Sequence, residues 1–210
     1  AYKMAGVRLD PFYDTSVGPA NGGSNYGFSG MTNGFTNNSL AYTSPKLGGA
    51  VTINASAYLD DADDQDYNIG AQYSKGGITA GIQTNSNGAV IALAPTDATA
   101  VRLYGGYKTK TFSVGASFEQ IDAEGDADKD TYMNLSGSYN MSSKTKLAAS
   151  FGSVEDAAAG TGRNGNGDGF SLGLFQKVLP KTTIYGIVSS VDYESADARD
   201  VVGIGVIQSF

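Results

Sequence analysis

Hydrophobic and polar positions alternate along most of this chain. In the stretch 50–59, Val51, Ile53 and Ala55 lie on one side of an extended chain, while Thr52 and Asn54 lie on the other. Successive side chains point to opposite faces of a β-strand, so a period of two indicates a strand and not a helix. The sequence therefore predicts an all-β fold.

The alternation predicts about twelve strands, most of them close to ten residues long. Their expected ranges are 3–9, 38–45, 50–59, 66–75, 78–85, 98–108, 111–121, 131–141, 145–154, 169–178, 182–193 and 200–210. A tilted strand of about ten residues crosses the hydrocarbon core of a membrane, whereas a transmembrane helix needs an apolar run of roughly 18 residues. The chain contains no such run.

The connections between these strands alternate in length. Short ones are expected at 46–49, 76–77, 109–110, 142–144 and 179–181, and long ones at 10–37, 60–65, 86–97, 122–130, 155–168 and 194–199. Short turns on one side and long loops on the other are typical of an up-and-down antiparallel β-barrel in an outer membrane. We expect residues 1–210 to form one such barrel domain.

Charge and polarity follow the same division. The polar face of the strands carries mainly Ser, Thr, Asn, Gln and Gly, as a water-filled lumen would require. Basic residues lie at or beside the short turns: Lys46, Lys75, Lys108, Lys110, Lys144, Lys146, Lys177 and Lys181. Most acidic residues lie in or beside the long loops, which we assign to the outer surface.

Composition excludes several classes of function. The chain has 210 residues, a net charge of −7, no Cys and no His. A Ser-His-Asp hydrolase, a Cys-His nucleophile pair and a histidine-ligated zinc site are therefore excluded. The acidic chain has no basic stripe, so nucleic acid is not an expected partner. We expect no enzymatic activity and no cofactor, apart from weak divalent cations such as Ca²⁺ at the acidic outer loops.

The last stretch, DVVGIGVIQSF, is an alternating strand that ends the chain on Phe210. Val202, Ile204, Val206 and Phe210 share one face. A terminal Phe on a lipid-facing strand would lie in the aromatic girdle at the membrane–water boundary. The alternative is an ordinary buried edge strand. This ending resembles that of bacterial outer-membrane β-barrels.

Three segments together resemble the general porins of Gram-negative outer membranes: NNSLAYTSPKLGG at 37–49, MSSKTKLAASFG with LPKTTIYGIV near the C-terminus, and the terminal strand. The resemblance implies an integral outer-membrane homotrimer that passes small hydrophilic solutes and ions. It also implies sixteen strands and a loop after the fifth that folds into the barrel, a position that 10–37 occupies here. Either the first four strands are missing, or the barrel is natively twelve-stranded and 3–9 pairs with 200–210.

Candidate site residues follow from the resemblance and from strand phase. Asp10, Asp14 and Tyr13 lie at the start of the expected constriction loop, although Asp beside Pro11 is also a common turn former. Strand phase places four charges on the lumen side: Arg102, Lys108, Glu119 and Lys146. A charge on the lipid face costs about 2–4 kcal/mol near the bilayer midplane, which favours the inside. These charges either tune selectivity or are simply solvated.

Two functions remain open at this level. The first is a diffusion channel with a mild cation preference, expected because the chain is acidic and Asp10 and Asp14 occupy the loop. The second is a closed structural or adhesive barrel whose acidic loops bind lipopolysaccharide or protein partners. In both cases the expected environment is outer-membrane lipid and lipopolysaccharide.

Overall fold

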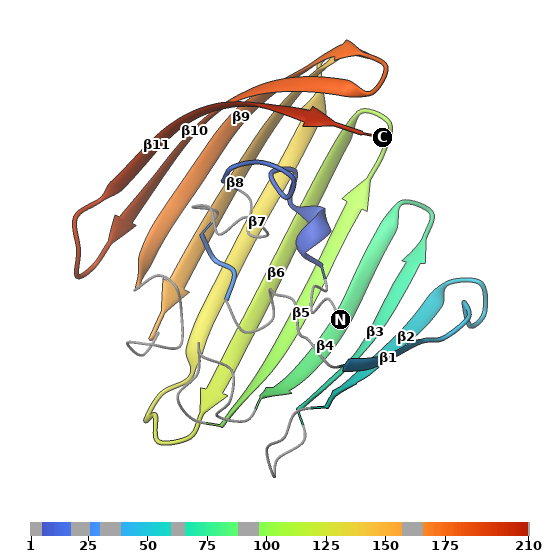
Figure 1. Ribbon diagram of the computed structural model, residues 1–210, viewed down its shortest axis with the longest axis vertical. Helices are drawn as coiled ribbons and strands as arrows, with labels where there is room; N and C mark the ends of the chain where they lie inside the picture. The colour runs from blue at the N-terminus through green and yellow to red at the C-terminus, as the bar shows by residue number, and fades with distance from the viewer. Residues whose placement is uncertain are drawn as a thin grey trace.

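A single antiparallel sheet forms the framework of the molecule (Figure 1). The computed structural model describes residues 6–17, 26–29, 39–59, 66–87, 97–156 and 166–209. In these ranges eleven strands pair strictly with their neighbours in sequence. They are β1 (Ser39–Thr43), β2 (Val51–Tyr58), β3 (Tyr67–Lys75), β4 (Ile78–Asn87), β5 (Ala98–Lys108), β6 (Phe112–Ala123), β7 (Asp130–Asn140), β8 (Thr145–Glu155), β9 (Gly167–Leu179), β10 (Thr182–Tyr193) and β11 (Arg199–Gln208). The predicted all-β antiparallel fold is confirmed.

The two faces of the sheet differ as the alternation predicts. In β7, Met133 and Leu135 are exposed on one face, while Asn134 and Ser136 are buried on the other. The same alternation runs through β3, β5, β6, β8 and β9. The convex face is apolar, and the concave face carries polar side chains covered in part by the N-terminal segment (Figure 1). None of the described residues forms a helix long and apolar enough to cross a membrane.

The predicted strand at 3–9 is wrong where the structure describes it. Residues Val7–Leu9 form a 3₁₀ helix, η1, that lies on the concave side and contacts β6. Gly6 adopts a φ of 77°, and the Leu9 amide donates a hydrogen bond to the Gly6 carbonyl at 3.0 Å. A glycine takes this left-handed conformation readily, so the alternating pattern of these few residues is interrupted by a turn. Residues 3–5 lie outside the described residues.

The described part of the sheet is open. β1 pairs only with β2, and β11 pairs only with β10. The pairing of 3–9 with 200–210 that a closed twelve-stranded barrel requires is absent from the described residues, because η1 lies against β6 instead. In β11, Val202 and Ile204 are 83% and 89% exposed on the outward face. Phe210, the expected girdle residue, lies outside the described residues.

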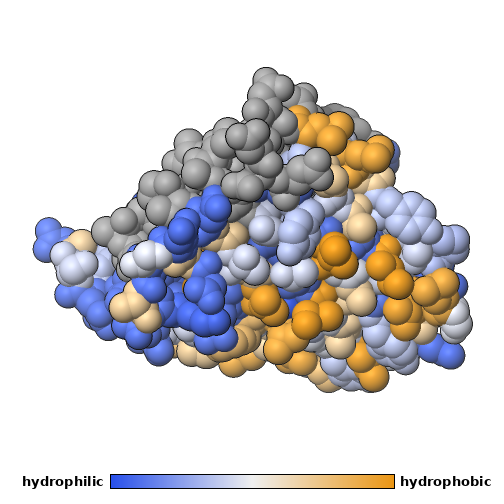
Figure 2. Space-filling view, turned by 90° about the horizontal axis from the view of Figure 1, so that it is seen from below, coloured by the Kyte–Doolittle hydropathy of each residue, from blue (hydrophilic) through white to orange (hydrophobic). Residues whose placement is uncertain are grey.

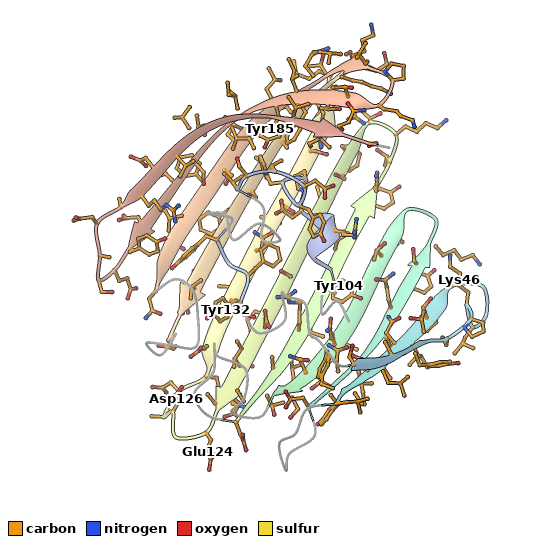
Figure 3. All side chains as sticks on the ribbon, in the orientation of Figure 1. Lys46, Tyr104, Glu124, Asp126, Tyr132 and Tyr185 are labelled. Carbon is orange, nitrogen blue, oxygen red and sulfur yellow. The ribbon has the colours of Figure 1, made fainter. Side chains whose placement is uncertain are left out.

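The two ends of the strands are chemically different. Among the described connections, 76–77, 109–111, 141–144 and 180–181 are short turns at one end, and the β6–β7 loop lies at the other. Figure 3 shows Lys46 at the short-turn end, and Glu124 and Asp126 at the long-loop end. Seen from below, polar residues gather on one side of the molecule, and apolar residues gather on the other and along the lower margin (Figure 2). The predicted alternation of turn lengths is confirmed for the described connections, whereas residues 18–25, 30–37, 60–65, 88–96 and 157–165 of the predicted long loops lie outside the described residues.

Candidate functional site

The concave face of the sheet carries a segment of the long N-terminal connection, residues 10–17. Phe12 and Val17 are completely buried in a cluster with Ala148, Phe175 and Ile187 of β8, β9 and β10. The ring centroids of Phe12 and Phe175 lie 5.9 Å apart. The hydrophobic side chains of the segment therefore anchor it to the inner wall, because burying them removes apolar surface from water.

Asp10, Tyr13 and Asp14 occupy different environments on this segment. Asp10 is 3% exposed, and one of its carboxylate oxygens accepts a hydrogen bond from the Phe12 amide at 3.0 Å. Burial raises the pKa of Asp10 to about 7, although this hydrogen bond and the charge of Lys146 oppose the increase. Tyr13 is buried with the Arg8 guanidinium 4.7 Å from its ring centroid. Asp14 is exposed and lines a cavity.

A second part of the same connection, residues 26–29, lies against the wall nearer the long-loop end. Tyr26 packs into a cluster that includes Ile121, Tyr132 and Val154, and Asn134 donates a side-chain hydrogen bond to the Tyr26 carbonyl at 3.2 Å. Gly27 has a φ of 85° and lies so close to the wall that a Cβ atom there would collide with the Met133 carbonyl. Only glycine fits this approach.

Arg102 and Glu119 form a buried pair across β5 and β6. They are directly opposite in the strand register, and Arg102 Nη2 and Nε lie 2.5 Å and 3.2 Å from Glu119 Oε2. Ser29 Oγ donates a hydrogen bond to Glu119 Oε1 at 2.8 Å, and the Phe28 ring centroid lies 5.5 Å from the Arg102 guanidinium. The two charges compensate each other, so this pair holds residues 28–29 against the wall.

Strand phase alone does not show that Arg102 and Glu119 are partners. Both were expected on the lumen side, and the structure places both on the concave face. Their pairing depends on the register between β5 and β6, which are joined by a short turn. The sequence pattern does not fix the exact ends of that turn, so it leaves the register uncertain by one or two residues. The sequence predicted two independent charges in the lumen. The structure shows instead that the two side chains form one ion pair with no net charge.

Lys108 and Lys146 lie near the short-turn end, where two cavities of about 470 and 430 Å³ adjoin. The cavities share Lys146 and Asn140, and we call them together the short-turn chamber. Its charged lining residues are Arg8, Asp14, Lys108, Lys110, Lys144, Lys146 and Lys177. Lys146 Nζ lies 4.1 Å from the ring centroid of Phe175.

Sequence reasoning recognised Lys144 and Lys177 as short-turn residues and missed that they line this cavity. For Lys177 of β9 the alternation of the strand could have shown this. Side chains two residues apart on a strand share a face, and Phe175 is buried on the inner face, so Lys177 lies on that face too. Lys144 lies in the turn before β8, where strand alternation does not apply.

Metal chemistry has little support among the residues that the structure describes. No group of three or more carboxylates is gathered there in a way that could hold a metal ion. In the acidic run 121–130, Asp122 pairs with Lys129 at 2.8 Å on an exposed loop. Weak binding of divalent cations at the outer loops stays a prediction.

Comparison with known sequences identifies one family. The sequence model described as "Gram-negative porin" matches residues 2–196. No curated protein matches the chain with significant sequence similarity.

Several solved structures share the fold at low sequence identity. An anion-selective porin from Comamonas acidovorans is 15% identical with a TM-score of 0.76, and the match covers 97% of this chain and 70% of that one. OmpT, an outer-membrane protein of Vibrio cholerae, is 19% identical with a TM-score of 0.59, covering 81% of this chain and 64% of that one. A mutant of the Rh. blastica porin is 18% identical with a TM-score of 0.60, covering 82% and 55%. This chain thus spans between about half and 70% of the length of these three proteins.

Proposed function

Because this chain belongs to the Gram-negative porin family, whose members are integral outer-membrane channels, we propose that it lets small hydrophilic solutes and ions diffuse across the outer membrane. The proposed transport needs no chemical step and no energy input. Residues 10–17 and 26–29 are the proposed constriction, because both are anchored on the concave face of the sheet.

The observation that carries this proposal is the contrast between the two faces of the wall. The outward face is apolar over the length of the strands, as contact with lipid requires. Apart from the hydrophobic clusters that hold Phe12 and Tyr26, the concave face carries small polar side chains, among them Asn68, Asn85, Ser117, Asn134, Ser136, Ser150 and Ser171. A closed structural barrel would instead fill its interior with large side chains, and it is the outcome to be excluded.

The ion preference depends on two regions of opposite charge. The predicted mild cation preference is supported by the net charge of −7 and by the acidic long loops. The short-turn chamber opposes it with six cationic side chains and one carboxylate, Asp14. Arg102 and Glu119 compensate each other and contribute to neither sign. We therefore expect a weak overall preference.

The test is single-channel recording of the native protein, purified from outer membranes, in a planar bilayer under a KCl gradient. We expect discrete open steps and a reversal potential within about 10 mV of zero, since opposed charges in series cancel much of each other's selectivity. A silent bilayer with an intact barrel would refute the channel and favour the closed structural barrel. A reversal potential close to the K⁺ or Cl⁻ limit would refute the opposed-charge account.

Assembly and outer-surface contacts are further parts of the proposal. A homotrimer predicts that conductance arrives in groups of three equal steps. Divalent cations are proposed to link acidic loop residues, such as Glu124 and Asp126, to lipopolysaccharide. The support for this contact is the concentration of carboxylates at the long-loop end.

A further inference from the structure

We propose that the short-turn chamber is a saturable binding site for small solutes that carry an oxyanion group, of which inorganic phosphate is the simplest. This inference rests on the proposed channel function and adds a substrate class to it. A solute would bind briefly in the chamber while it crosses the channel. In a channel without these charges it would only diffuse through.

The first argument is charge. Six cationic side chains and one carboxylate line the chamber. Within the part of the chain that the structure describes, none of these six cations forms an ion pair. The nearby Asp10 is buried and interacts electrostatically with Lys146. The chamber therefore has a large excess of positive charge that is available to a solute.

The second argument is strand phase, which distinguishes a solute site from a lipid contact. Lysines that bind the head groups of membrane lipids would lie on the outward face, as Lys75 of β3 does. Lys108, Lys146 and Lys177 instead alternate with outward residues and share the inward face. These lysines of β5, β8 and β9 line the two parts of the chamber: Lys108 lines one part, Lys177 lines the other, and Lys146 lines both.

The third argument is the shape and polarity of the cavity. Its two parts, about 470 and 430 Å³, are each within the size range of small-molecule sites, roughly 300–1,000 Å³. The lining adds neutral hydrogen-bonding groups to the lysines: Thr111, Ser142, Ser143 and Thr145. Phe175 lies beneath Lys146 and holds its ammonium group by a cation–π contact.

Lysine side chains suit the binding of an oxyanion that must afterwards be released from the chamber. Its ammonium is a compact point charge on a flexible stem, and it binds phosphate without the fixed bidentate geometry of arginine. Conduction requires binding that is favourable enough for entry and weak enough for release. Several lysines around an open cavity satisfy both conditions.

The experiment measures how inorganic phosphate changes the single-channel KCl current of the native protein and of two variants. In the wild type we expect a saturable decrease in current as phosphate is added on the short-turn side. The variant Lys146→Gln/Lys177→Gln removes two inward charges, and we expect the half-saturating phosphate concentration to rise at least tenfold. The matched control Lys75→Gln removes an outward lysine at the same end, and we expect it to change that concentration less than twofold.

Further variants and outcomes distinguish a loss of phosphate binding from damage to the barrel. A charge-preserving variant, Lys146→Arg/Lys177→Arg, should keep phosphate inhibition within about threefold, which separates loss of charge from damage to the barrel. Open channels without any saturable effect of phosphate would overturn the site and leave the channel function standing. Equal effects of the inward and outward substitutions would also overturn it. A wild-type protein that does not conduct would refute the proposed function itself.

Discussion

Glu119 shows how a single residue can stabilise the inner wall of the sheet. Its side chain is completely buried and contacts both Arg102 of the neighbouring strand and Ser29 of the N-terminal connection. A buried ion pair contributes little net stability compared with apolar residues, but the loss of one partner leaves a buried charge without compensation. The effect of a substitution therefore depends on which partner remains.

We predict that Glu119→Ala lowers the free energy of unfolding by about 3–5 kcal/mol, because Arg102 stays buried and charged after it loses the Glu119 carboxylate. Urea titration of the protein folded in lipid vesicles measures this change. The double variant Arg102→Met/Glu119→Leu removes both charges and should recover most of the loss. A single variant as stable as the wild type would contradict the role of the pair.

Asp10 makes a separate, pH-dependent prediction at the same scale. Burial raises its pKa to about 7, so the group is mostly neutral at pH 5.5 and mostly charged at pH 8.5. The charged carboxylate offsets the positive field of Lys146. Raising the pH should therefore shift the reversal potential in a KCl gradient toward the K⁺ limit.

The matched variant for this prediction is Asp10→Asn, which keeps the side-chain size and cannot ionise. Its reversal potential should stay constant between pH 5.5 and 8.5 to within a few millivolts. A variant that keeps the full pH shift of the wild type would assign the shift to another group.

Strands are the elements that the sequence predicts best, because the requirement for lipid on one face and polar groups on the other imposes a strict period of two. That period predicted that Arg102 and Glu119 face inward, and both are buried on the concave face. It could not distinguish a short strand from η1, since Gly6 introduces a turn into a stretch that otherwise alternates. It also left the register open, so the pairing of Arg102 with Glu119 emerged only from the structure.

The outward face gives a prediction at the level of the element. Leu135→Arg places a charge on the apolar face in the middle of β7 and should lower the free energy of unfolding in lipid vesicles by about 2–4 kcal/mol. Ser138→Arg, on the same strand, points toward the short-turn chamber and should cost much less. The comparison is made by urea titration of both variants in the same vesicles. Equal losses would contradict the assignment of the faces.

At the scale of the whole molecule, three regions of the fold differ in chemical character. The apolar outward face of the sheet suits contact with lipid, segments 10–17 and 26–29 are anchored on the concave side, and the two ends differ in charge. The class of fold and the separation of charge between the ends were predictable from the sequence. The alternation of polar and apolar residues, and the contrast between basic short turns and acidic long loops, recur from one hairpin to the next. The anchoring of the two segments was not, because it depends on contacts between residues far apart in sequence.

The separation of charge has an electrical consequence. Carboxylates gather at the long-loop end and ammonium groups at the short-turn end, so the pathway resembles a junction between a cation-rich and an anion-rich compartment. A voltage that drives mobile K⁺ and Cl⁻ toward the junction fills it with carriers, whereas the opposite voltage empties it. The protein should therefore behave as a weak rectifier, and the sign of the larger current would reveal which end of each inserted molecule faces which side of the bilayer.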